Sequence, residues 1–78
     1  MILTITLGPW TKDSAGYHRK WQGPGLKDDM AAGVYDHDES WTWEVWPPWS
    51  ATRLAHGVCE TEAGAKAQAD AALDRHLR

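Results

Sequence analysis

The chain of 78 residues contains no phenylalanine and a single cysteine, whereas it contains six tryptophans. Because Cys59 is alone, no disulfide can form within the chain, and no set of Cys and His residues has the spacing of zinc ligands. Neither a cross-link nor a cofactor is therefore expected to stabilise a domain this small. The tryptophans are the remaining source of stability, because each buried indole removes roughly 200 Å² of surface from water.

The chain also lacks a long hydrophobic run and an excess of positive charge. Its apolar start, MILTITL, has no basic region and ends at Gly8 and Pro9, so it is unlike a signal peptide and too short to span a membrane. The net charge of -3 argues against a general nucleic-acid binder or membrane binder. A free thiol without an export signal indicates a cytoplasmic protein.

Alternation of apolar and polar residues predicts four strands. Residues 2–7, ILTITL, and residues 17–22, YHRKWQ, are expected to form an N-terminal hairpin. Residues 41–46, WTWEVW, and residues 52–59, TRLAHGVC, are expected to form a second strand pair. The sequence leaves open which side chains of the last strand face the core, either Leu54 and Val58 or the small set of Ala55, Gly57 and Cys59.

The segment between the two strand pairs, residues 23–40, is expected to be a long acidic excursion. Gly23, Pro24 and Gly25 interrupt the chain at its start, and it contains five acidic residues with few strand formers. A helical turn around residues 26–32 is one conformation that this composition allows. Long loops in compact domains are often functional, which directs attention to this segment.

An alanine-rich helix is predicted over residues 61–77, with Thr61 as the N-cap. Its expected inward face consists of four small or aliphatic side chains: Ala65, Ala69, Ala72 and Leu73. The chain is therefore predicted to be one α+β domain, an antiparallel sheet of three or four strands with the C-terminal helix packed on one face.

The tryptophans of residues 41–49 are expected to divide into two groups. A helix face of methyl groups leaves space that the sheet must fill, and Trp41 and Trp43 are placed to fill it. Trp46 points to the other side of its strand and Trp49 follows two prolines, so these two indoles are assigned to an apolar patch outside the core.

Charge is distributed unevenly along the chain. Residues 28–44 contain six acidic residues and no Lys or Arg: Asp28, Asp29, Asp36, Asp38, Glu39 and Glu44. One interpretation is a solvated loop that forms internal ion pairs of under about 1 kcal/mol each with the basic segment of residues 12–27. The other is a surface that binds a basic partner, with Tyr35, Trp46 and Trp49 as aromatic anchors and the acids as steering charges.

Other side chains suggest other functions. A small nucleic-acid-binding module would use Lys12, Arg19, Lys20 and Trp21 of the basic hairpin segment, residues 12–27, because rings and cations combine in single-strand binders. The stretch YDHDE, residues 35–39, does not match the spacing of a calcium or zinc site, so no metal is expected. Cys59 is expected to be a small core residue, and no catalytic motif is present, so the chain is not expected to be an enzyme.

The pattern of residues 41–77, with WTWEVW, then LAHGVCET, then EAGAKAQADAALDRHL, resembles the ends of small proteins encoded by phages, prophages and mobile elements. Among these, small acidic proteins without a catalytic signature are similar in kind to anti-CRISPR proteins. The resemblance implies a partner, the basic DNA-binding groove of a Cas effector in the bacterial cytosol, and it implies no individual site residue. Within the same population, a self-associating structural phage protein is an alternative, and both a monomer and a homodimer remain open.

Overall fold

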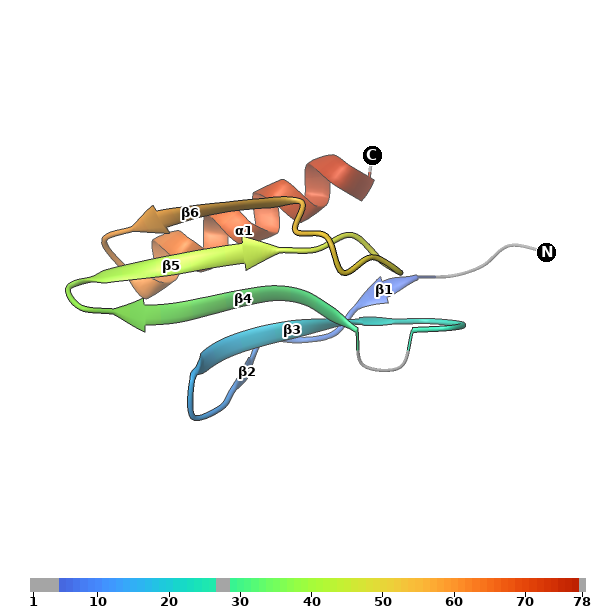
Figure 1. The fold of residues 1–78 in the computed structure, drawn as a ribbon, viewed down its shortest axis with the longest axis horizontal. Helices are drawn as coiled ribbons and strands as arrows, with labels where there is room; N and C mark the ends of the chain where they lie inside the picture. Colours follow the sequence, from blue (N-terminus) through green and yellow to red (C-terminus); the bar gives the residue numbers. More distant parts are fainter. Residues whose placement is uncertain (1–4, 27–28, 78) are drawn as a thin grey trace.

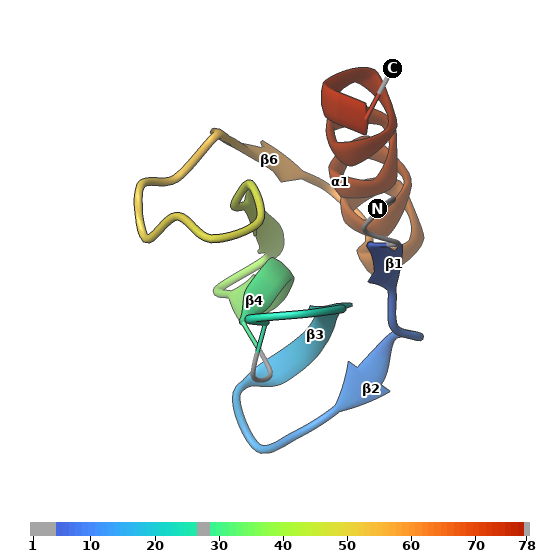
Figure 2. The same cartoon turned by 90° about the vertical axis from the view of Figure 1, so that its right-hand side faces the viewer.

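The computed structural model describes residues 5–26 and 29–77. Its elements are β1 (Thr6–Leu7), β2 (Thr11–Lys12), β3 (Gly16–Gln22), β4 (Met30–His37), β5 (Ser40–Val45), β6 (Ala55–Cys59) and α1 (Glu62–Leu77). The strands form one antiparallel sheet in the order β1-β3-β4-β5-β6, and β2 also pairs with β3. The sheet is curved, with α1 on its concave side (Figure 1 and Figure 2).

The α+β class with a C-terminal helix on one face is confirmed, but the expected three or four strands are wrong, because the described residues form a sheet of six. Part of the difference lies in the N-terminal hairpin. Gly8 and Pro9 interrupt the chain, so two short strands, β1 and β2, pair with different parts of β3. Residues 2–4 of the expected first strand lie outside the described residues.

The larger correction concerns residues 23–40, which were expected to form an excursion. Met30–His37 instead form β4, which lies between β3 and β5 at the centre of the sheet. Its buried residues Ala31, Ala32 and Val34 are mostly small, and alanine has a low strand propensity. The helical turn expected around residues 26–32 is not formed in the described part of that range. Residues 30–32 are extended, and Leu26 donates a backbone hydrogen bond to the carbonyl of Gly23.

The core lies between α1 and the sheet. The predicted helix face is confirmed, since Ala65, Ala69, Ala72 and Leu73 are buried. Trp43 and the fully buried Trp21 fill the space that this thin face leaves, whereas Trp41 is only half-buried at the edge of the core.

Strand β6 turns its smallest side chains toward Trp43. Gly57 pairs with Trp43 across the sheet, and a Cβ at Gly57 would lie 2.7 Å from the Trp43 indole nitrogen. Ala55 and Cys59 share this face, whereas Val58 is exposed on the other. The open question about the last strand is therefore settled in favour of the small set.

The start of α1 is formed as predicted. The Thr61 hydroxyl accepts a hydrogen bond from the Gly64 amide at 3.0 Å, which satisfies one of the free N–H groups of the first turn. In the described part of the chain, no helix has both the length and the apolar character needed to cross a membrane.

We expect Gly57→Ala to destabilise the fold by about 1–3 kcal/mol, because the added methyl group would overlap the Trp43 indole and force the ring to move. Urea unfolding measures this change. The matched control is Gly64→Ala in α1, where the atom nearest the added carbon is the exposed Thr61 hydroxyl oxygen at 3.0 Å and alanine favours the helix by about 1 kcal/mol. Equal stability of Gly57→Ala and the wild type would contradict the packing of Trp43 on Gly57.

Candidate binding site

The predicted acidic surface is divided between three places in the fold. Asp36, Asp38 and Glu39 are exposed at and beside the turn between β4 and β5. Asp29 precedes β4 at the other end of the strand. Seven residues separate it from Asp36, which corresponds to roughly 23 Å at a rise of about 3.3 Å per residue. Figure 1 shows this turn at one end of the sheet and the segment that follows β5 at the other. Asp28 lies outside the described residues.

Glu44 and Tyr35 lie on the sheet face opposite α1. Glu44 accepts a hydrogen bond from Arg53 at 2.8 Å, so its charge is partly compensated within the chain. The Tyr35 ring lies over Gly33, where a side chain would overlap the phenol. Burial raises the pKa of Tyr35 above its ordinary value, and the nearby carboxylates of Glu44 and Asp13 raise it further.

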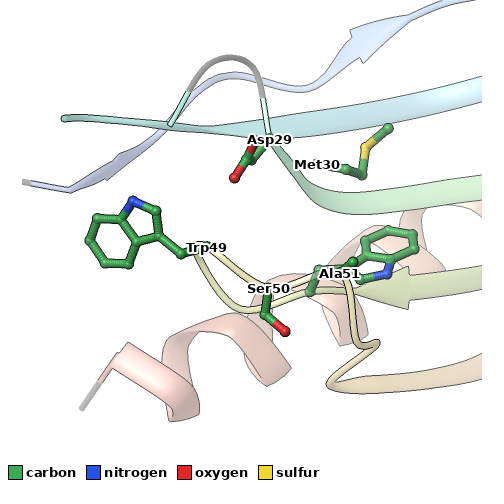
Figure 3. A pocket seen from close by; sticks show the side chains of 6 residues that line it. Asp29, Met30, Trp49, Ser50 and Ala51 are labelled. Carbon is green, nitrogen blue, oxygen red and sulfur yellow. The ribbon is translucent and has the colours of Figure 1, made fainter. Parts of the chain in front are cut away.

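Three of the predicted partner-binding residues do come together. Asp29, Trp46 and Trp49 line a pocket of about 570 Å³ at the end of the sheet, together with Met30, Ser50 and Ala51. We call this the tryptophan pocket. Figure 3 shows the Asp29 carboxylate on the same side as the Trp49 indole, with Met30 further along β4. The sequence did not predict Met30, Ser50 or Ala51 as part of a site. Ser50 and Ala51 have no distinctive sequence signal, and Met30 falls in the segment expected to be an excursion.

Hydrogen bonds to neighbouring elements hold the walls of the tryptophan pocket. The Trp46 amide donates to the carbonyl of Ala31 at 2.9 Å, and the Trp46 carbonyl accepts a hydrogen bond from the indole of the buried Trp21 at 2.8 Å. The Trp49 indole donates to the carbonyl of Pro24 at 3.3 Å. The pocket is thus attached to the core on one side and to the loop after β3 on the other.

The composition of the pocket favours one kind of ligand group. Indole faces attract cations, and a carboxylate beside them adds a charge of opposite sign. Met30 offers an adaptable apolar wall for a hydrocarbon chain. A Lys or Arg side chain, with its charged end on an apolar stem, matches this combination of groups.

Two of the four residues of the alternative nucleic-acid site, Arg19 and Trp21, are used inside the fold. Arg19 donates to the carbonyl of Gly8 at 2.8 Å and pairs with Asp70 of α1 at 2.7 Å. Trp21 is fully buried. Both point toward α1 because alternation along β3 places them on the helix side. Of the other two, Lys12 is exposed and Lys20 is half-buried.

Two further sequence predictions concern reactive groups. Cys59, expected to be a buried core residue, is only half-buried and packs against the edge of the core. Among residues 5–26 and 29–77, no three His, Cys, Asp or Glu side chains lie close enough together to hold a metal ion.

We expect Tyr35 to ionise above the ordinary tyrosine pKa of about 10. Its contribution to folding stability is therefore complete below about pH 10 and is lost as the pH rises through the raised pKa. Ultraviolet titration of the wild type minus Tyr35→Phe isolates this group from Tyr17. Glu44→Gln should lower the midpoint of the Tyr35 titration, because it removes a negative charge that disfavours the ionised phenol. Glu60→Gln should leave this midpoint unchanged. A midpoint at or below that of free tyrosine would show that the phenol is neither buried nor near these carboxylates.

Comparison of the chain with protein-family profiles, with curated proteins and with solved structures finds no match. The assignment of a function therefore depends on the geometry and chemistry of the chain itself.

Proposed function

We propose that this chain is a non-catalytic inhibitor that binds a host protein complex by taking a Lys or Arg side chain of the partner into the tryptophan pocket. The observation that supports this proposal is the meeting of Asp29, Trp46 and Trp49 around one pocket. Asp29 precedes Trp46 by 17 positions and Trp49 by 20, so the fold brings two separate segments together.

Trp49 is the anchor of the proposed contact. About half of its surface, 51%, is exposed, although burial of an indole is favourable. Its backbone has a positive φ of 58°, which is uncommon for a bulky residue and is often found at functional positions. An exposed tryptophan held by a hydrogen bond to a neighbouring loop is typical of interface residues that contribute most of the binding energy.

The acids of the β4–β5 turn have a separate role in the proposal. Asp36, Asp38 and Glu39 are exposed at the end of the sheet far from the pocket, so they act through long-range attraction and not through contact with the same side chain. A negative tip on a chain of net charge -3 accelerates association with a basic surface.

The proposed partner is a basic, nucleic-acid-binding surface of a bacterial complex, and specifically a CRISPR effector. Such a surface presents many Lys and Arg side chains, which are the ligands that the tryptophan pocket accepts best. Blocking it by occupation requires no catalytic group in the inhibitor. The inhibitor would therefore compete with DNA for the effector.

We expect Trp49→Ala to weaken binding to an immobilised CRISPR effector by roughly 10- to 30-fold, because truncation of an interface tryptophan costs about 2 kcal/mol. Asp29→Asn should weaken binding in the same direction. The matched control is Asp74→Asn, an exposed acid of α1 that does not line the pocket. Biolayer interferometry with and without competing DNA measures both the affinity and the competition.

Two results of this experiment have different meanings. If the wild type does not bind any effector, the proposed partner is wrong. If the wild type binds and Trp49→Ala binds equally well, the tryptophan pocket is not the contact.

The acidic tip gives a separate kinetic prediction. Neutralising Asp36, Asp38 and Glu39 to Asn or Gln should lower the association rate and reduce its dependence on salt, while the dissociation rate changes little. Association rates at two salt concentrations measure this effect. An unchanged rate and an unchanged salt dependence would exclude a steering role for the tip.

A further inference from the structure

Strand β6 is an edge of the sheet that lacks the usual protection. It pairs with β5 on one side, and no strand of the described residues pairs with its other side. In an antiparallel sheet, alternate N–H and C=O groups of such a strand point outward and can accept another strand. Its sequence, AHGVC, contains neither Lys nor Pro, the residues that commonly prevent edge pairing.

The exposed aliphatic side chains of the described residues are concentrated at this edge. Val58 is 64% exposed and Leu54 is 41% exposed. Among the described residues, Trp49 is the other large apolar side chain that is exposed. Beside Leu54, a hollow of about 310 Å³ separates the start of β6 from α1, and it is lined by Leu54, Ala55, Ala72 and Arg75. The β6 edge therefore combines unpaired backbone groups with an apolar surface.

We propose that the β6 edge binds the β6 edge of a second copy of this chain, in antiparallel orientation about a two-fold axis at Gly57. Only this register pairs all five residues of the strand with all five of the other copy. It places His56 of each copy opposite Val58 of the other and continues the sheet across the dimer. Both copies of α1 then lie on the same face of the extended sheet.

Charge complementarity favours a second copy over an unrelated strand. Arg53 precedes β6 and Glu60 follows it, so the two ends of the edge carry opposite charges. Antiparallel pairing about Gly57 places Glu60 of one copy opposite Leu54 of the other, next to Arg53 and near the hollow that Arg75 lines. Arg53 already pairs with Glu44 of its own copy, so Glu60 of the other copy adds a second carboxylate to an arginine with several donors.

The edge also has no net charge that would oppose self-association. Residues 53–60 contain one Arg and one Glu, although the whole chain has a net charge of -3. Asp36 pairs with Trp41, which pairs with Cys59, so the acidic tip lies at the C-terminal end of β6, and the antiparallel register puts the tips of the two copies at opposite ends of the dimer. A dimer formed in this way presents two tryptophan pockets, which would increase avidity for a partner with repeated basic side chains.

Sedimentation equilibrium of the purified protein tests the dimer. We expect a concentration-dependent dimer whose dissociation constant rises at least tenfold in Val58→Lys, because a lysine on an edge opposes strand pairing. The control Val58→Thr keeps a β-branched side chain without a charge and should change the constant less than threefold. Circular dichroism shows that each variant is folded, and Val58 is exposed enough that neither substitution disturbs the core.

Disulfide trapping tests the register independently. In a Cys59→Ser background, a mixture of the single variants His56→Cys and Val58→Cys should form a disulfide-linked dimer on mild oxidation, because these positions are opposite each other. Each single variant alone should form much less disulfide-linked dimer. In this register, residue 56 of one copy is displaced by two residues along the strand from residue 56 of the other, and the same is true of residue 58.

Three results would overturn the proposal. The first is a monomer at all concentrations up to about 1 mM. The second is a dimer that Val58→Lys does not weaken but Trp49→Ala does, which would place the contact at the tryptophan pocket. The third is equal trapping in the mixture and in the single variants, which would exclude this register.

Discussion

The packing of two indoles against a helix of alanines is the constraint on which the rest of the structure depends. The buried face of α1 consists of methyl groups and one leucine, so it cannot fill the space above the sheet by itself. Trp21 of β3 and Trp43 of β5 fill it, and neighbouring strands must give them room. Gly57 removes a side chain from β6 beside Trp43, and the small residues of β4 let the helix approach the centre of the sheet.

A second set of contacts attaches the N-terminal strands to this core. Arg19 of β3 reaches Asp70 of α1, and the Trp10 indole donates to the same carboxylate at 3.4 Å. The Lys66 ammonium of α1 lies 3.6 Å from the centre of the Tyr17 ring, in a cation–π contact. The cations that look available in the sequence are thus partly used to join β3 to the helix. For this reason, the uneven charge distribution of the chain overstates its basic surface.

The parts of the fold that could be predicted are those with a strong local pattern. The helix was predictable from its alanines and Thr61, and β5 from alternating tryptophans. Strand β4 was not predictable, because a strand of small residues that is buried on both faces has neither alternation nor many β-branched side chains. The failure to predict β4 also affected the predicted binding site. Residues 28–44 look like one acidic segment in the sequence, but β4 runs through them and separates their two ends. The tryptophan pocket could be predicted in part, through Asp29, Trp46 and Trp49. Alternation along residues 41–46 turns Trp46 away from the predicted core, and two prolines separate Trp49 from this segment.

The tryptophans therefore divide by role: Trp21 and Trp43 support the fold, whereas Trp46 and Trp49 line the pocket that we propose binds a cationic side chain. The most direct test is nuclear magnetic resonance of the indole N–H groups, each assigned by single substitution, during titration with a hexa-arginine peptide. We predict chemical-shift changes at Trp46 and Trp49, an unchanged Trp43 signal, and protection of the Trp21 and Trp43 N–H groups from exchange with solvent. Changes at Trp10 and Trp41 without changes at Trp49, or rapid exchange at Trp21, would contradict this division of roles.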